Sequence, residues 1–425
     1  MNKVVKTLII LLFLNFLLHR AQAEEIFTEE ILTWQDCIKE AAKNHPDLIS
    51  AGESVKKSEA SKKITASALL PQVDSNVGAS TAKTASATTD TYSYGVSGTQ
   101  LLFDGAKTIS DIKAAKENIK AAQYSYKFTS SEVRLRLRTA FINLLKAQEL
   151  LNITKEIYNI RRGNLELITL RYISGIEHQG ALLNAEANLE QAKFEISQAE
   201  RGLQVAQREI IKEMGRTEFS SVRTQGDFKV SDAALEKPDF VELAKNNPSL
   251  EKLIAQKNAA AFGIKAAEAD FLPQLSAQAG ASRSSSHLPP EGDRWNAGLS
   301  LSLPLFEGGL RAAEVAQAKA LFNQAEADER SAKDGVILTL EQTWAELQDA
   351  VETVGVQEKY LAAAQERARI AEAQYSLGLI QFDNWTIIED DLVRTKKAFL
   401  NAQANASLAE AAWVQVKGET LEYAN

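Results

Sequence analysis

The side chains that most often perform chemistry are few in this chain and lie far apart. Beyond the N-terminal segment, the histidines are His45, His178 and His287, and none has a neighbour at metal-ligand spacing. The run Glu389-Asp390-Asp391 lacks the pattern of a calcium-binding loop, so we expect it on a solvated helix face. No G-x-S-x-G, P-loop or G-x-G-x-x-G motif is present. We therefore expect no catalytic residue, no metal site, no cofactor and no enzyme activity.

The first 23 residues have the features of a cleaved export signal. Lys3 and Lys6 precede a short apolar core over residues 8–18, and Ala21-Gln22-Ala23 is typical of a cleavage site. Cleavage would remove three positive charges from a formal net charge of −8, giving −11. An acidic exported chain is not expected to bind nucleic acid. The single cysteine, Cys37, cannot form an internal disulfide and is expected to be buried on the first helix.

Four short motifs recur at a nearly constant distance, which indicates an internal duplication. Their offsets are 202, 202, 203 and 203 residues, too long for a solenoid array and typical of two structural halves. The pairs are Asn44-His45-Pro46-Asp47-Leu48 with Asn246-Asn247-Pro248-Ser249-Leu250, Leu69-Leu70-Pro71-Gln72-Val73 with Phe271-Leu272-Pro273-Gln274-Leu275, Leu102-Phe103-Asp104-Gly105 with Leu305-Phe306-Glu307-Gly308, and Arg171-Tyr172-Ile173-Ser174-Gly175-Ile176 with Gln374-Tyr375-Ser376-Leu377-Gly378-Leu379.

Each half is expected to contain a helix, a strand pair, a very long helix and a returning helix. The expected ranges are a signal at 1–23, a first repeat at 24–215 with strands 72–81 and 92–103 and helices 104–172 and 178–215, a linker at 216–237, and a second repeat at 238–425 with strands 274–283 and 295–304 and helices 307–377 and 383–418. The long helices follow from the absence of proline between Pro71 and Pro238 and after Pro304. Their heptad spacing, as in Val133, Leu137, Phe141 and Leu144, favours packing against parallel or antiparallel helices.

The four strand segments alternate apolar with small or polar residues over about ten positions, as outer-membrane strands do. Tyr92, Tyr94 and Trp295 near one end, with Phe103 and Phe306 near the other, are candidates for aromatic girdles. A soluble hairpin packed on helices fits these segments equally well. Four strands cannot close a membrane barrel, and open sheet edges are not tolerated in hydrocarbon. Two copies would supply eight strands and three would supply twelve. The strand segments alone do not decide between these two numbers.

The doubled N-x-P-x-L, L-P-Q, L-F-[DE]-G and Tyr-x-x-Gly motifs resemble the TolC-type outer-membrane efflux proteins over residues 32–419. The resemblance implies a mainly α fold with a membrane β-barrel, in which a homotrimer shares twelve strands above a barrel of long antiparallel coiled-coil helices. It implies an export channel in the outer membrane of a Gram-negative bacterium, in contact with lipid and extending into the periplasm. Its partners would be a periplasmic adaptor (membrane fusion) protein and an inner-membrane transporter, with no cofactor. The identity of the cargo and of the adaptor is not readable from the sequence.

The resemblance also assigns roles to particular residues. The glycine-containing turns would form the periplasmic tip and contact the adaptor, at Arg171, Tyr172, Gly175, Ile176, Tyr375, Gly378 and Leu379. Independently of any adaptor contact, Gly175 and Gly378 are each expected to end a helix in the left-handed conformation. The strand-to-helix junctions would lie at Phe103, Gly105, Phe306 and Gly308.

Asp383 is the nearest acidic candidate for a charged constriction, because three copies around an axis would form a negative ring. The favoured interpretation is simpler: Asp383 is expected to cap the returning helix. Glu177 and His178 are expected to be solvated loop residues.

The main alternative is a non-conducting periplasmic or surface coiled-coil structural protein, which would also contain long heptads. The two strand pairs argue against it, because a spacer has no need of them. Adaptor proteins also contain coiled-coil hairpins, but a single hairpin does not match a doubled unit.

Overall fold

The computed structural model describes residues 30–231 and 236–423. The expected export signal at 1–23 lies outside them. In chain order the elements are β1 (Glu30–Leu32), α2 (Trp34–Asn44), α3 (Pro46–Ser67), β2 (Gln72–Lys83), β3 (Thr88–Phe103), α4 (Lys107–Ile173), α5 (Gln179–Glu213), β4 (Val222–Thr224), α6 (Phe240–Lys245), α7 (Pro248–Ala269), β5 (Gln274–Ser285), β6 (Gly292–Ser302), α8 (Leu310–Ser376), α9 (Phe382–Val416) and a short 3-10 helix at Leu421–Tyr423. Within these ranges, no helix has a stretch apolar and long enough to cross a bilayer.

The six longest helices form three pairs of identical length. α3 and α7 each have 22 residues, α4 and α8 each have 67, and α5 and α9 each have 35. At the usual rise of 1.5 Å per residue, α4 and α8 each extend over about 100 Å of helix. The chain divides into two compact units, which are described separately.

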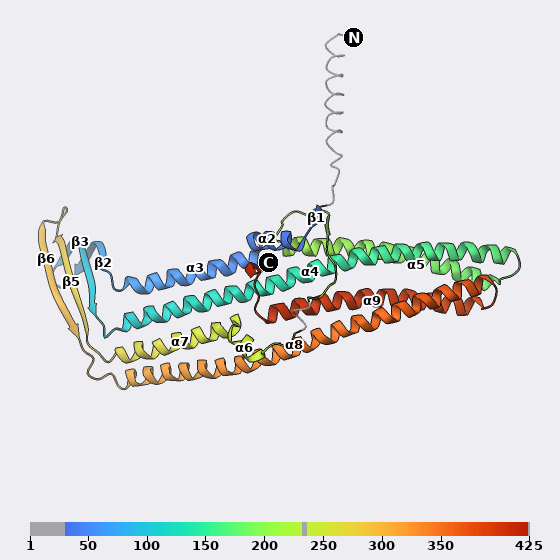
Figure 1. Ribbon diagram of the computed structural model, residues 1–425. Coiled ribbons are helices and arrows are strands. Elements are labelled where there is room, and N and C mark those ends of the chain that lie inside the picture. The colour runs from blue at the N-terminus through green and yellow to red at the C-terminus, as the bar shows by residue number, and fades with distance from the viewer. Residues whose placement is uncertain (1–29, 232–235, 424–425) are drawn as a thin grey trace, which may run out of the picture. The chain divides into compact units, whose positions relative to one another are not determined.

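One unit comprises Glu40–Thr139, Lys229–Lys359 and the C-terminal segment from Asn405, and it contains a four-stranded antiparallel sheet. The strand order is β2-β3-β5-β6, so β2 and β6 form the two edges. In Figure 1 the helices of this unit run side by side next to the sheet, and ion pairs join them. Lys107 of α4 lies 2.8 Å from Asp270, which follows α7, and Lys257 of α7 lies 2.5 Å from Glu329 of α8.

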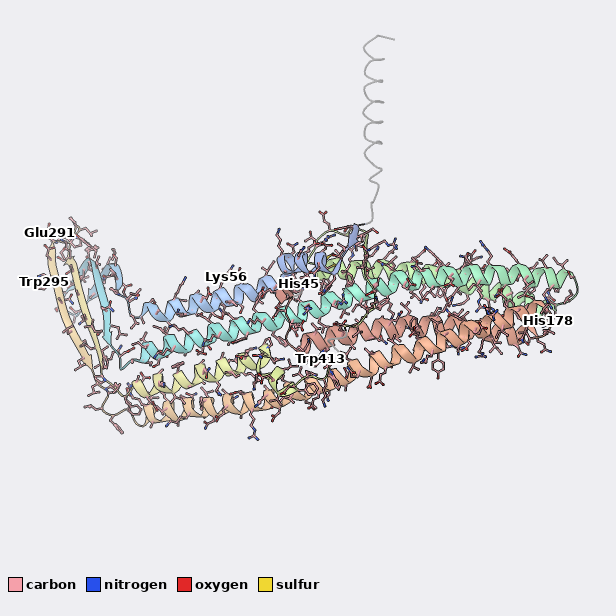
Figure 2. All side chains as sticks on the ribbon, in the orientation of Figure 1. His45, Lys56, His178, Glu291, Trp295 and Trp413 are labelled. Atoms are coloured by element: carbon pink, nitrogen blue, oxygen red, sulfur yellow. The ribbon has the colours of Figure 1, made fainter. Side chains whose placement is uncertain are left out.

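The sheet has one apolar face and one polar face, as its register shows. Val77 pairs with Tyr94, and Ala281 pairs with Trp295, so these side chains project from the same face as their partners. Val77 is 85% exposed and Trp295 is 83% exposed; Trp295 is labelled on β6 in Figure 2. The opposite face carries mainly serine, threonine, asparagine, glutamine and glycine, for example in the row Asn76, Gly95 and Ser282.

All four strands of the sheet are longer than expected. β2 ends at Lys83 and β3 begins at Thr88, so the two strands include most of the Ser/Thr/Ala-rich residues 82–91, which lie between the expected strand ranges. A hydrogen bond of 2.7 Å between Thr81 Oγ1 and Asp90 Oδ1 joins the two strands there. β5 likewise continues to Ser285 instead of 283. β6 starts earlier than expected but ends at Ser302 rather than 304, before Pro304, which has no N–H to donate.

The long helices begin three residues later than expected, because the chain first turns through left-handed residues. Gly105 and Ala106 have φ values of 67° and 68°, and the Asp104 carboxylate accepts a 2.8 Å hydrogen bond from the backbone N–H of Thr108. At the corresponding position before α8, Gly308 and Gly309 have φ values of 61° and 86°. The returning helices also end earlier than expected, at Glu213 and Val416, and Gly215 and Gly418 follow with positive φ.

The core of this unit lies where α6, α8 and the end of α9 meet. Leu340, Leu347 and Trp413 are buried there with Ala244, and Phe240 packs edge-on against Trp413 with 6.5 Å between ring centroids. This cluster fixes the last turns of α9 on α8.

The other unit comprises the described part of residues 1–39 with Ala140–Phe228 and Tyr360–Ala404. Strands β1 and β4 pair in parallel, and two side-chain amides fasten β4 to helices. Gln148 of α4 accepts from the N–H of Thr224 at 2.9 Å and donates to its carbonyl at 3.0 Å. Gln207 of α5 donates to the carbonyl of Val222 at 2.9 Å. The segment that follows α5 is therefore held on the helices by these hydrogen bonds together with buried apolar side chains such as Met214 and Val222.

Candidate functional site

Both turns that join a long helix to a returning helix have the same backbone hydrogen bonds. After α4, the N–H of Ile176 donates to the carbonyl of Arg171 at 2.9 Å, and the N–H of Gly175 donates to that of Tyr172 at 3.0 Å. After α8, Leu379 donates to Gln374 at 2.8 Å and Gly378 to Tyr375 at 2.9 Å. This is the Schellman pattern, which requires a left-handed residue; Gly175 has φ 71° and Gly378 has φ 74°. Each glycine therefore has the helix-ending conformation expected from the sequence.

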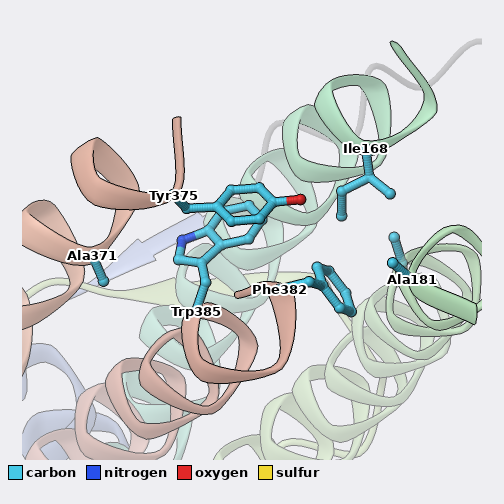
Figure 3. Packing of buried hydrophobic residues seen from close by; sticks show 7 residues of the cluster. Ile168, Ala181, Ala371, Tyr375, Phe382 and Trp385 are labelled. Carbon is cyan, nitrogen blue, oxygen red and sulfur yellow. The ribbon is translucent and has the colours of Figure 1, made fainter. Parts of the chain in front are cut away.

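The two turns are joined by a buried aromatic cluster. Tyr375 of α8 stacks on Trp385 of α9 with 4.4 Å between centroids and 11° between planes. Figure 3 shows this stack with Phe382 beside it and with Ile168 and Ala181 facing it from α4 and α5. The end of α4, the start of α5, the end of α8 and the start of α9 thus share one small core.

A polar chain continues from this core. The Arg171 guanidinium lies 4.7 Å from the centroid of the Tyr375 ring, and it donates to the Tyr375 carbonyl at 3.2 Å. The Tyr375 hydroxyl donates to the Glu177 carboxylate at 2.8 Å. Burial and the neighbouring Glu177 carboxylate raise the pKa of Tyr375, so the phenol stays protonated and remains a donor.

Of the two expectations about these turns, one is wrong and one is confirmed. Glu177 is not a solvated loop residue, since its side chain is only 10% exposed and is bound by Tyr375. His178 lies in the loop with a side chain that is 68% exposed, as expected, and it also caps α5, where its Nδ1 accepts from the N–H of Ala181 at 3.1 Å. Glu177 and Tyr375 are separated by 198 residues, and no local pattern in either turn indicates the contact.

The remaining tip residues divide into supporting and outward-facing groups. Tyr375 is only 1% exposed, so it supports the turn instead of presenting a surface. Tyr172, Ile176 and Leu379 are exposed, as expected for contact residues. Three further apolar residues beside them are exposed, and the turn motifs assign no role to them: Leu170, Ile173 and Leu377. The glycine motifs predict the positions of the turns. They do not predict how many exposed aliphatic side chains surround each turn.

Asp383 does not cap α9, because the helix begins one residue earlier at Phe382. Asp383 lies in the first turn and is exposed. Asn384 and Ile387 are exposed on the same helix, within one turn of it. The expectation of a cap is therefore wrong, and the aperture role stays a prediction.

The strand-to-helix junctions are closely packed around Gly105. A Cβ at this position would lie 2.7 Å from Cβ of Leu272 and 2.9 Å from the carbonyl oxygen of Ala269. Gly308 has no such close neighbour and is required there by its φ of 61°. Phe103 and Phe306 are both exposed at these junctions.

Within residues 30–231 and 236–423, no group of three His, Cys, Asp or Glu side chains is arranged to hold a metal ion. The polar contacts described above join the two turns and fix their positions.

Comparison with known proteins agrees with this description. The family model for "Outer membrane efflux protein" matches the chain twice, over residues 37–216 and 240–419. The chain is 20% identical to the outer membrane efflux protein BepC of Brucella suis over 93% of this chain and 89% of that protein. It is 23% identical to the outer membrane protein TolC of Escherichia coli, over 72% of this chain and 65% of that one. The crystal structure of the Campylobacter jejuni CmeC outer membrane channel superposes with a TM-score of 0.79 at 19% identity, covering 90% of this chain and 84% of CmeC.

These matches favour a channel over the alternative of a non-conducting coiled-coil protein, and they confirm the location in the outer membrane. The chain belongs to the outer membrane efflux protein family.

Proposed function

We propose that this chain is one protomer of a trimeric exit duct, through which cargo delivered by an inner-membrane pump and a periplasmic adaptor leaves the cell. The observation that supports an oligomer is the four-stranded sheet with β2 and β6 at its two edges and one exposed apolar face, and the number three comes from the family resemblance. Unpaired edges are not tolerated in lipid, so the sheet must close with further copies. β2 and β6 run antiparallel, so an edge of one copy can pair with the other edge of the next. Three copies would give twelve strands, as the family resemblance implies.

The two glycine turns are the proposed adaptor surface. The exposed aliphatic side chains are Ile173 and Ile176 on one turn with Leu377 and Leu379 on the other, and the stack of Tyr375 and Trp385 belongs to the core that the two turns share. An adaptor that binds a splayed arrangement of these turns more tightly than a closed one would open the duct by shifting the population. Transport through the duct is passive, and Asp383 is a candidate for a charged ring at its narrow end.

The equal lengths of the paired helices support an origin of the two halves by duplication. Two related halves per protomer would let α4 with α5 and α8 with α9 alternate around the duct.

The test is the native mass of the protein extracted from outer membranes in mild detergent. We expect a heat-sensitive species of three chains that conducts ions when reconstituted in planar bilayers. A soluble monomer or dimer outside the membrane fraction would refute the duct and favour the coiled-coil structural protein.

A further inference from the structure

A buried carboxylate lies between α4 and α9, one helix turn beyond Trp385. Glu389 is 7% exposed. The cation that faces it is Arg161 of α4, whose own side chain is 9% exposed. Arg161 also pairs through Nη2 with Asp390, the residue after Glu389. A single guanidinium therefore serves two adjacent carboxylates at the interface of these helices.

The groups around Glu389 carry more negative than positive charge. From α4 it is faced by Arg161 and by Asn164, which hydrogen-bonds to the carboxylate. From α8 it is faced by the Glu372 carboxylate, and from α9 by Asp390. α5 contributes only the neutral residues Ala185 and Asn188 to the small cavity beside Glu389. That cavity has a volume of about 10 Å³, enough for one water at most.

This environment penalises the ionised form of Glu389. Burial raises the pKa of Glu389 above its usual value of 4.5, and the Glu372 and Asp390 carboxylates raise it further. Arg161 and Asn164 oppose the shift without cancelling it. When the helices separate, the carboxylate returns to water and to its ordinary pKa. A group whose pKa is raised in the packed state stabilises that state fully at low pH, and the stabilisation is lost as pH rises through the raised pKa.

We propose that Glu389 makes the tip sensitive to pH: protonated, it holds α9 against α4, and ionised, it favours separation of the two helices. The packed arrangement of α4 and α9 is then most stable below pH 4.5 and loosens as the pH rises above that value. The inference rests on the proposed function in one respect, since the separation of these helices is taken to be the opening of the duct.

Hydrogen exchange of the purified full-length protein tests the proposal. The measured quantity is the protection factor of the backbone amides in α9 near Glu389. This ratio of intrinsic to observed exchange rate removes the intrinsic pH dependence of exchange. Between about pH 5 and about pH 8 we expect protection to fall, by no more than about tenfold per pH unit because one proton is involved. Glu389→Gln keeps the side-chain shape but cannot ionise, so its protection should stay high throughout. Wild-type protection that is independent of pH, or a fall that persists in Glu389→Gln, would overturn the proposal.

Two further variants make the test specific. Glu372→Gln removes a carboxylate that raises the Glu389 pKa, so the fall in protection should move to lower pH; an unmoved transition also overturns the proposal. This variant keeps the test decisive if Glu389→Gln does not fold. Glu186→Gln, on the exposed surface of α5, is the matched control and should behave like the wild type.

The proposed function and this inference fail separately. A protein that shows the pH-dependent exchange but never conducts in bilayers would refute the duct alone. A conducting trimer with pH-independent protection in α9 would refute the role of Glu389 alone.

Discussion

Tyr375→Phe removes one hydroxyl from the tip and leaves the aromatic core in place. The hydroxyl donates to Glu177 at 2.8 Å, and both side chains are largely buried. The stack on Trp385, with 4.4 Å between centroids, does not involve the hydroxyl and should persist. The variant therefore isolates a single hydrogen bond between the two turns.

The expected cost follows from the charge and burial of the acceptor. A buried hydrogen bond to a charged group contributes about 1.5–3 kcal/mol. A loss of about 2 kcal/mol corresponds to about a 30-fold change in an equilibrium constant. If the bond holds the tip in the packed arrangement, the ratio of open to closed channels should rise by up to about that factor.

Single-channel recording in planar bilayers, without adaptor, measures this ratio. Tyr360→Phe is the matched control, because Tyr360 is exposed on α8 and undergoes the same chemical change. We expect frequent openings in Tyr375→Phe and wild-type behaviour in Tyr360→Phe. An open fraction in Tyr375→Phe equal to that of the wild type would refute a role of this hydrogen bond in tip closure.

Four further variants test other parts of the structure. Gly378→Val places a β-branched residue at φ 74°, so it should abolish export while the trimer still assembles. Gly163→Ala lies inside α4 in open space, so it should stabilise the protein by about 1 kcal/mol in thermal unfolding. For Gly378→Val, an export assay measures transport and the native mass in detergent measures trimer assembly. Unchanged export would disprove the assignment of the tip. Gln148→Ala leaves the backbone of Thr224 without its side-chain partner, at about 1–3 kcal/mol, and should speed proteolysis after α5. Trp413→Ala should destabilise by about 3–5 kcal/mol in denaturant unfolding, and a change below 1 kcal/mol would contradict the core described.

Global features of the fold were predictable because they leave repeated signals in the sequence. The absence of proline after Pro71 predicts an uninterrupted helix, and alternation predicts strands. Strand ends were less predictable, since the Ser/Thr/Ala-rich residues 82–91 have little apolar alternation although most of them pair in β2 and β3. The start of α4 was missed because Ala106 adopts a left-handed conformation usually reserved for glycine.

The site was predictable only where the backbone itself imposes a residue type. Gly175 and Gly378 were found because a helix that ends in this way requires φ above zero. The contact of Glu177 with Tyr375 and the pairing of Arg161 with Asp390 join distant parts of the chain through ordinary charged residues. One sequence has no pattern that distinguishes such residues from solvated ones.

The equal lengths of α4 and α8, and of α5 and α9, have a consequence for how this protein can evolve. Deleting one residue from a helix rotates everything beyond it by about 100° and shortens it by about 1.5 Å. A change confined to one half would rotate the buried face of that helix towards solvent. It would also shift the turn at the end of that helix along the helix axis relative to the turn of the other half. Length can therefore drift only in coordinated steps, with the same number of residues gained or lost in both halves and preferably in multiples of seven.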